Sequence, residues 1–373
     1  MRFSIIYEAQ TVATTREAEF ALFHELVEQS LLAEELGFDC VWAVEHTSLV
    51  QYAHMSAPES FLAYLAGRTT RLHLGHGVVC LPPAMNHPIK VAQRIATLDI
   101  LSKGRLHFGV GKGGSQQEAG AFGYRLEELP PMIDESMYLI PRMFVEDEIE
   151  HDGVHIKIPR RPVIPKPYQK PHPAMYLACT RNESLLTAGA RGLGALMFGF
   201  GGPEDVAQKS RAYRGAFAAR RVEDQVGFRP TEHVAALCPA VVLDDRELAR
   251  RIGMRGQRFF VESLAHWYNG APPPGLDDID IEGHLRALEH IKQSYVARIG
   301  DETITLPRDL AGYFEEVRHA YGTREDCLRY VGQLADAGAD EILFLVQMGT
   351  IPHAVVMETI RNIGTYVIPR MRS

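Results

Sequence analysis

The chain has 373 residues, of which 46% are hydrophobic and 23% are charged, a balance typical of a globular protein. Its formal net charge of -8 argues against nucleic-acid binding, which usually requires a basic stripe. The five cysteines show neither paired nor metal-ligand spacing, no secretory signal pattern opens the chain, and no apolar run reaches membrane-spanning length. We therefore expect a cytoplasmic protein with no metal site and no membrane contact.

Strand-like and helix-like segments alternate along the chain. The predicted strands are residues 2–8, 38–44, 71–81, 105–110, 174–179, 194–200, 234–243 and 341–348. The predicted helices are residues 19–36, 57–68, 87–101, 132–144, 183–192, 204–221, 324–337 and 353–366. Eight such pairs predict an α/β fold, a TIM (β/α)8 barrel, formed by one domain over residues 1–373, with its active site at the carboxyl ends of the strands.

Two segments do not fit the simple repeat. Residues 145–173 are too rich in proline for a regular helix or a central strand, so we interpret them as an ordered excursion between barrel units. Residues 246–321 form the largest insertion, after the seventh strand, and combine aromatic, proline-rich and acidic stretches. Their position at the active-site rim suggests a lid, and a packed helical decoration is the alternative.

The stretch 71–114 is predicted to be a strand–helix–strand unit that ends in the glycine-rich loop GKGG. A loop of this kind at the end of a strand offers backbone N–H groups to a phosphate. Gly109, Gly111 and Gly114 also match the dinucleotide-binding pattern G-x-G-x-x-G. However, no long helix follows the loop, and this disfavours a Rossmann site.

Several segments in order resemble the bacterial luciferase-like, flavin-dependent monooxygenases. The resemblance rests on Glu45-His46 after the second strand and on the segments 86–113, 165–184 and 366–369. It implies a TIM-type barrel that binds FMN at the carboxyl ends of its strands. Members of this family usually receive reduced FMN from a separate flavin reductase, or use a 5-deazaflavin coenzyme instead. The resemblance also implies a homodimer that packs through the helices 57–68 and 87–101.

The resemblance further implies a phosphate site built from two loops, and its residues are Lys112, Gly113, Gly114, Ser115, Glu183, Ser184 and Thr187. A lysine, two hydroxyls and the free N–H groups at the start of a helix all suit an anion. Glu183 would repel a phosphate, so we expect its backbone to donate while its carboxylate turns away. For Ser184 the alternative is a simple helix N-cap.

His46 matches the catalytic histidine of the family and is our candidate for proton transfer, since histidine titrates near neutral pH. Gly77-Val78 matches the position where the family carries a bulge and a non-prolyl cis peptide against the flavin ring; close backbone approach is the alternative reason for these glycines. Weaker candidates for substrate contact end or follow strands and are Glu8, His87 and Gln347. Many relatives have a second histidine where Thr47 stands, and luciferase has a reactive cysteine where Gly111 stands.

From these features we predict a two-component monooxygenase that uses reduced FMN and dioxygen, by way of a C4a-(hydro)peroxyflavin, to oxygenate a small organic substrate. One alternative is hydride transfer with a deazaflavin on the same barrel. Another is a non-catalytic relative that only binds flavin. Hydrolysis is disfavoured because the chain lacks a G-x-S-x-G elbow.

Overall fold

The fold was analysed in a computed structural model of the chain, which describes residues 1–276 and 319–373. Eight parallel strands form a closed barrel in the spatial order β9, β11, β1, β2, β3, β4, β7, β8, and β8 pairs with β9 to close the ring. Their bounds are β1 Arg2–Tyr7, β2 Cys40–Ala43, β3 His73–Cys80, β4 Leu106–Gly111, β7 Ala174–Cys179, β8 Gly194–Met197, β9 Val234–Val242 and β11 Glu341–Leu345. Each of the eight predicted strands is present, which confirms the TIM-barrel prediction.

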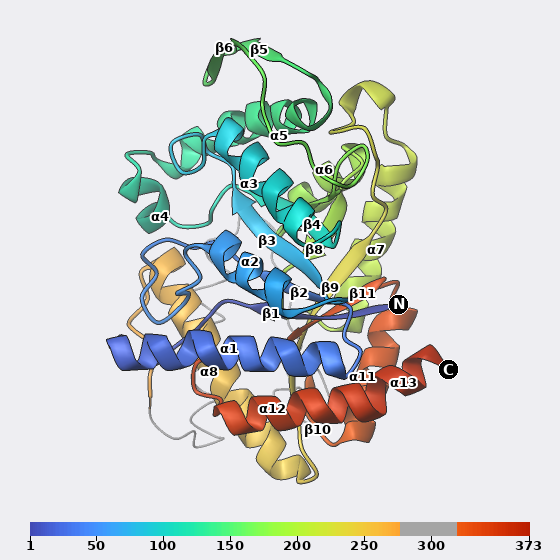
Figure 1. The fold of residues 1–373 in the computed structure, drawn as a ribbon. Coiled ribbons are helices and arrows are strands. Elements are labelled where there is room, and N and C mark those ends of the chain that lie inside the picture. Colours follow the sequence, from blue (N-terminus) through green and yellow to red (C-terminus); the bar gives the residue numbers. More distant parts are fainter. Residues whose placement is uncertain (277–318) are drawn as a thin grey trace.

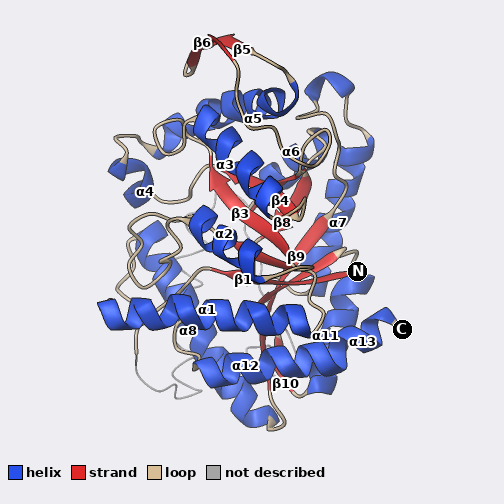
Figure 2. Cartoon of the chain, viewed as in Figure 1, coloured by secondary structure: helices blue, strands red, loops and turns tan. Residues whose placement is uncertain are grey.

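Helices surround the barrel (Figure 2), and α1 and α12 lie side by side on its outer surface (Figure 1). Their bounds are α1 Arg16–Glu35, α2 Pro58–Arg68, α3 Pro88–Leu101, α4 Gln116–Ala121, α5 Leu129–Val145, α6 Asn182–Ala190, α7 Pro203–Ala218, α8 Arg246–Asn269, α11 Arg324–Asp336, α12 His353–Asn362 and α13 Ile368–Arg372. Short 3-10 turns span Leu126–Glu128 and Val222–Asp224, and a π-helical turn at Ile363–Val367 joins the last two helices.

Local sequence sets the ends of these helices. His87 caps α3, with Pro88 at its first position, and the helix stops before Lys103 and Gly104, which have positive φ angles of 58° and 81°. Thr323 caps α11 in a capping box with Asp326. The predicted helix 324–337 therefore matches the observed one to within a residue.

The proline-rich excursion contains a two-stranded antiparallel hairpin, β5 (Ile149–Asp152) and β6 (Lys157–Arg161), which lies outside the barrel sheet and extends past α5 (Figure 1). Pro159 lies within β6 and the other prolines follow the hairpin; the bonds to Pro165 and Pro171 are cis. Lys166 Nζ donates to the carbonyl of Met143 at 2.7 Å and so holds this segment against α5.

The predicted insertion 246–321 begins with α8, which packs against β9 and against the short strand β10 (Ala320–Gly322) paired to it. The part of the prediction that covers residues 277–318 lies outside the described residues.

A buried charged cluster fills the end of the barrel where the strands begin. Glu341, at the start of β11, is fully buried; its carboxylate lies 3.0 Å from Arg2 Nη2 and 2.8 Å from His233 Nε2. The same carboxylate accepts hydrogen bonds from the hydroxyl of Ser4 at 2.5 Å and from the indole N–H of Trp42 at 2.8 Å. Burial alone would raise the pKa of Glu341, but His233, Arg2 and Ser4 hold it well below its ordinary value.

The cluster predicts a strong loss of stability for Glu341→Gln, because the change leaves the partly buried Arg2 guanidinium without its counter-charge. We expect about 3 kcal/mol less free energy of unfolding at pH 7, measured by urea denaturation. A depressed pKa stabilises the fold above the unfolded value near pH 4 and loses that effect as the pH falls. The deficit should therefore shrink at pH 3.5.

The control is Glu146→Gln, which breaks the more exposed pair between Arg142 and Glu146 on the surface. Exposed pairs contribute at most about 1 kcal/mol, so this variant should stay close to the parent protein. Equal losses for the two variants would contradict a structural role for the cluster.

Candidate active site

His46 lies at the opposite end of the barrel, three residues beyond β2, between two glutamates. Its Nδ1 is 2.8 Å from Oε1 of Glu118, which belongs to α4 after β4. Its Nε2 is 3.4 Å from Oε2 of Glu8, which directly follows β1. The three side chains are buried, with exposed fractions of 14%, 3% and 11% for His46, Glu118 and Glu8. The barrel thus places a histidine between two carboxylates in a nearly closed site.

The burial of these groups sets their protonation. Burial raises the pKa of Glu8 to about 7; the positive charge of His46 opposes this shift and the negative charge of Glu118 adds to it. Burial lowers the pKa of His46, but the hydrogen bond and charge of Glu118, together with Glu8 and Glu45, outweigh it and raise the net value. Glu118 has a lowered pKa because its hydrogen bonds from His46, Ser115 and Gly114 overcome its burial. Glu8 therefore changes protonation near neutral pH, and the pKa of His46 lies above its ordinary value.

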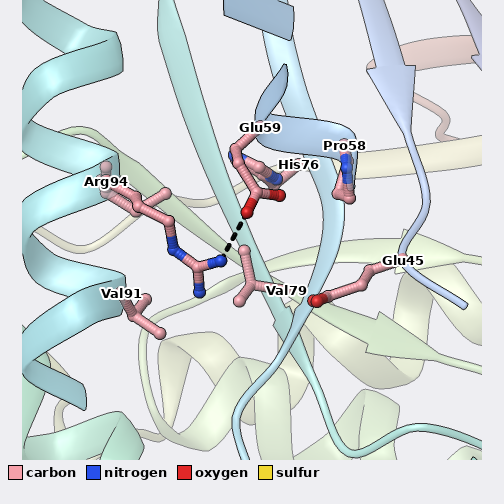
Figure 3. Close-up of a pocket in the computed structure, with 8 residues that line it drawn as sticks. Glu45, Pro58, Glu59, His76, Val79, Val91 and Arg94 are labelled. Carbon is pink, nitrogen blue, oxygen red and sulfur yellow. Dashed lines mark hydrogen bonds and ion pairs between the residues drawn. The ribbon is translucent and has the colours of Figure 1, made fainter. Parts of the chain in front are cut away.

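Glu45 holds the loop that carries this histidine. Its carboxylate accepts the backbone N–H of Cys80 at 2.7 Å and the side-chain amide of Asn86 at 2.8 Å. Asn86 in turn accepts a hydrogen bond from Arg94 on α3, and Arg94 forms an ion pair with Glu59 on α2 at 2.5 Å. Figure 3 shows this pair and Glu45 around a small pocket between α2, α3 and β3. The network links the end of β2 to two outer helices.

Two cationic side chains lie close together where β4 and its neighbour β7 end. Lys112 is half-buried, and its pKa is lowered by burial and then by the nearby charge of Arg181, while Glu183 raises it. Among the described residues, neither Lys112 nor Arg181 has a side-chain ion pair or hydrogen bond. Two neighbouring cations that form no ion pair suit an anion such as a phosphate, although the charge of Glu183 also acts on Lys112. Sequence reasoning missed Arg181, although it stands beside the predicted Glu183 and Ser184.

The other predicted phosphate ligands have partners within the chain. Ser184 lies at the third position of α6 and is not its N-cap, which is Arg181, so the N-cap alternative is wrong. The Ser184 hydroxyl bonds to the backbone of Arg181, and Thr187 donates to the carbonyl of Glu183 at 2.8 Å. The Glu183 side chain is exposed. A hydroxyl that donates its proton to a carbonyl cannot donate the same proton to an anion, although its oxygen can still accept a hydrogen bond. The two hydroxyls are thus committed to α6.

The amides of Gly114 and Ser115 also differ from the expectation that they face a phosphate. Both donate to Oε2 of Glu118, at 3.2 and 3.1 Å, and the Ser115 hydroxyl donates to the same oxygen at 2.8 Å. Of the predicted loop, the Lys112 side chain stays free of such bonds among the described residues, while the backbone of Gly113 faces the Cys80 thiol. Sequence reasoning did not single out Glu118, but the capping-box spacing of Ser115 and Glu118 was a detectable signal.

The Gly77–Val78 peptide bond is cis, and the pairing of β3 with β4 shifts between His76 and Val79, as the predicted bulge requires. A Cβ on Gly111 would lie 2.5 Å from Val78 Cγ2. Gly111 on β4 therefore leaves room for Val78, and the two strands approach closely at this point.

Of the three weaker candidates for substrate contact, one lies beside His46 and two bond to the backbone. Glu8 faces His46, as described above. His87 is exposed and caps α3, where its Nδ1 accepts the N–H of Ile89 at 3.3 Å. Gln347 bonds through both ends of its amide to the backbone of Gln10, at 2.8 and 3.0 Å. Both of these side chains have structural partners.

Aromatic residues that were not predicted border the histidine. The ring of Tyr52 lies 5.3 Å from that of His46, edge-on, and 5.5 Å from Phe260 on α8. Phe200, after β8, packs on Phe260 with a ring separation of 5.4 Å. Tyr52 and Phe260 are almost fully buried and Phe200 is half-buried. The inserted helix α8 thus supplies an apolar wall beside the candidate catalytic group.

A family model described as luciferase-like monooxygenase matches residues 1–341. The chain belongs to the luciferase-like monooxygenase family. This confirms the resemblance that the sequence segments indicated.

Curated members of the luciferase-like family resemble parts of the chain. The oxygenase component of a flavin-dependent trigonelline monooxygenase from Acinetobacter baylyi is 31% identical over 48% of this chain and 49% of that protein. An alkanal monooxygenase alpha chain from Photorhabdus luminescens is 30% identical over 45% of this chain and 46% of that protein. The chain therefore spans about half the length of these curated relatives.

Solved structures match the whole barrel. Monooxygenase RslO1 from Streptomyces bottropensis superposes with a TM-score of 0.77 at 23% identity, over all of both chains. The oxygenating constituent of 3,6-diketocamphane monooxygenase from Pseudomonas putida, in complex with FMN, gives 0.74 at 17% identity over 99% and 98% of the chains. A coenzyme F420-dependent tetrahydromethanopterin reductase from Methanopyrus kandleri gives 0.67 at 19% over 99% of each. At these identities the matches show the fold.

Within the described residues of this luciferase-like protein, no helix combines the length and apolar character needed to cross a membrane. In the same residues, no three His, Cys, Asp or Glu side chains are arranged to hold a metal ion.

The raised pKa of Glu8 predicts that Glu8→Gln stabilises the protein at alkaline pH. The folded state binds more protons than the unfolded state between about pH 4.5 and pH 7, so the parent protein loses stability as the pH rises through this window. Glutamine removes that cost, and we expect a gain of about 3 kcal/mol at pH 8.5 and little change at pH 4.5. Thermal denaturation at the two values measures the difference.

Glu127→Gln, at an exposed carboxylate paired with Arg125, serves as the matched control and should shift neither midpoint by much. A Glu8→Gln variant that gains nothing at pH 8.5 would show that Glu8 ionises there without cost.

Proposed function

We propose that this luciferase-like protein is a two-component, FMN-dependent monooxygenase that receives reduced FMN from a separate flavin reductase and oxygenates a small organic substrate with dioxygen. The observation that carries the proposal is the pair of neighbouring cations, Lys112 and Arg181, which form no ion pair among the described residues and lie on the same barrel rim as the carboxylate-flanked His46. The description of a relative as an oxygenase component, and of a structural neighbour as an FMN complex, supports it.

The residues present fit FMN at this rim. Lys112 and Arg181 would hold the phosphate, with the backbone of Gly113, because a dianion balances the two cations that the fold leaves together. Gly77 and Val78 would lie against the flavin ring. When bound, reduced FMN supplies the electrons that activate dioxygen.

The remaining chemistry belongs to the side chains of the chain itself. His46 holds a proton at Nδ1 for Glu118 and exchanges one at Nε2, the atom that faces Glu8. Tyr52 and Phe260 keep water from this side of the site, which protects reactive oxygen from being lost as hydrogen peroxide. In this proposal α8 belongs to a lid.

The test mixes the protein with photoreduced FMN under anaerobic conditions and then with dioxygen in a stopped-flow instrument. We expect tight binding of reduced FMN and a transient absorbance, distinct from reduced and oxidised flavin, that outlives the reoxidation of free flavin. His46→Ala should change the pH dependence of its decay and alter the rate by at least about a hundredfold at the optimum. His24→Ala, at an exposed histidine that bonds only to the carbonyl of Phe20 among the described residues, is the control.

Reoxidation at the rate of free flavin, with no transient, would contradict the monooxygenase proposal. Tight binding and oxygen-independent redox turnover of F420 would favour the deazaflavin alternative. Flavin binding with neither reaction would indicate a non-catalytic relative.

We also propose that the protein is a homodimer that packs through α2 and α3. Tyr64 on α2 and Ile100 and Leu101 on α3 are large apolar side chains with 54%, 43% and 58% of their surface exposed. Large exposed apolar side chains on two helices that pack against each other suit an interface. Leu101→Glu should then convert a dimer into a monomer in light scattering, while a parent protein that is already monomeric would end the proposal.

A further inference from the structure

The carboxylate of Glu118 joins two loops at the mouth of the barrel. Its Oε1 accepts hydrogen bonds from Nδ1 of His46 at 2.8 Å and from the backbone N–H of Thr47 at 3.4 Å. Its Oε2 accepts from the backbone N–H groups of Gly114 and Ser115 and from the Ser115 hydroxyl. Five donors therefore converge on a side chain that is only 3% exposed.

The bonds to Oε2 fix the orientation of the Glu118 carboxylate independently of its contact with His46. Ser115 and Glu118 form the capping box of α4, so the side chain of Glu118 folds back over the start of its own helix. Rotating it away would break three hydrogen bonds to Oε2 inside a buried site, which is costly. Oε1 is thus held as a rigid acceptor for Nδ1 of His46.

We propose that the anion held by the amides of Gly114 and Ser115 is Glu118 itself and not the cofactor phosphate, and that Glu118 is a positioning residue for His46. It keeps Nδ1 as a donor and directs the basic Nε2 toward Glu8. The inference rests on the proposed function only in the proton-transfer role given there to His46.

The groups that face His46 come from several elements. Glu118 approaches from α4, Glu8 from the end of β1, and Glu45 precedes it in the chain. Tyr52 contributes a neutral ring and a hydrogen bond to Glu8. Among these groups, Glu118 acts on His46 both by a hydrogen bond and by its charge, and both raise the pKa of the imidazole.

The segment from Lys112 to Glu118 then serves two purposes, one at each end. Lys112 begins the loop beside Arg181 and Glu183, where the phosphate is proposed to bind. Glu118 ends it at His46. Phosphate affinity and histidine titration should therefore respond to different substitutions, although only six positions separate the two residues.

The experiment compares Glu118→Gln with Lys112→Met by two measurements on the full chain. The first is the titration of His46, followed by NMR on histidine-labelled protein and assigned with His46→Gln. The second is the ratio of affinities for FMN and riboflavin, measured by flavin fluorescence quenching, since the two ligands differ only in the phosphate. We expect Glu118→Gln to move the His46 titration to lower pH and to change the affinity ratio less than twofold. Lys112→Met should lower the ratio about tenfold and leave the titration in place.

Glu127→Gln is the matched control, because this exposed carboxylate lies in the same segment and pairs only with Arg125 among the described residues. If Glu118→Gln does not fold, Glu118→Asp retains a carboxylate for the helix cap but is one methylene too short to reach both loops. It should lower the His46 titration by a smaller amount.

An unchanged His46 titration in both Glu118 variants would overturn the inference. So would a fall in the FMN-to-riboflavin ratio for Glu118→Gln as large as that for Lys112→Met, because the amides would then serve the phosphate. If the parent protein binds FMN no better than riboflavin, the proposed cofactor role of Lys112 fails, while the titration of His46 still decides the role of Glu118.

Discussion

The site depends on one constraint, the closure of eight parallel strands into a ring by the pairing of β8 with β9. Parallel strands end on the same rim, so Glu8 after β1, His46 after β2 and Glu118 after β4 meet although 110 positions of sequence separate the first from the last. None of these side chains would find another within its own strand–helix unit. The closed ring, and not local sequence, creates the group of charges.

The two ends of the barrel treat buried carboxylates in opposite ways. At the end of the barrel where the strands begin, Glu341 has donors on both oxygens and a depressed pKa, so it stays ionised and stabilises the fold. At the carboxyl ends of the strands, Oε2 of Glu8 is buried and has no hydrogen bond among the described residues, and the pKa of Glu8 is raised to about 7. A group that is left short of donors at the cost of stability is typical of a functional site. The same fold thus holds one carboxylate for structure and another for chemistry.

Much of this could be predicted from sequence. All eight barrel strands could be predicted, because buried parallel strands such as 234–243 are short continuous apolar runs that alternate with helical segments. The motif around His46 and the cis bond before Val78 followed from resemblance. Glu118 escaped because its spacing to Ser115 is that of an ordinary helix cap, and only the folded barrel shows that its second oxygen reaches His46. The aromatic wall escaped for a similar reason, since Tyr52 and Phe260 are far apart in sequence and meet only through α8.

The glycine-rich loop after β4 illustrates how one pattern can have several physical causes. Gly113 has a φ of 78°, a conformation that favours glycine whatever the loop binds. A Cβ on Gly114 would overlap the hydroxyl end of Tyr268 from α8. The lack of a side chain at Gly114 therefore lets α8 approach the rim. The amide of Gly114 then points to Glu118. Two glycines that suggest a phosphate cradle are therefore explained by a turn and by helix packing, and the positive charge of Lys112 is what remains in this loop to attract an anion.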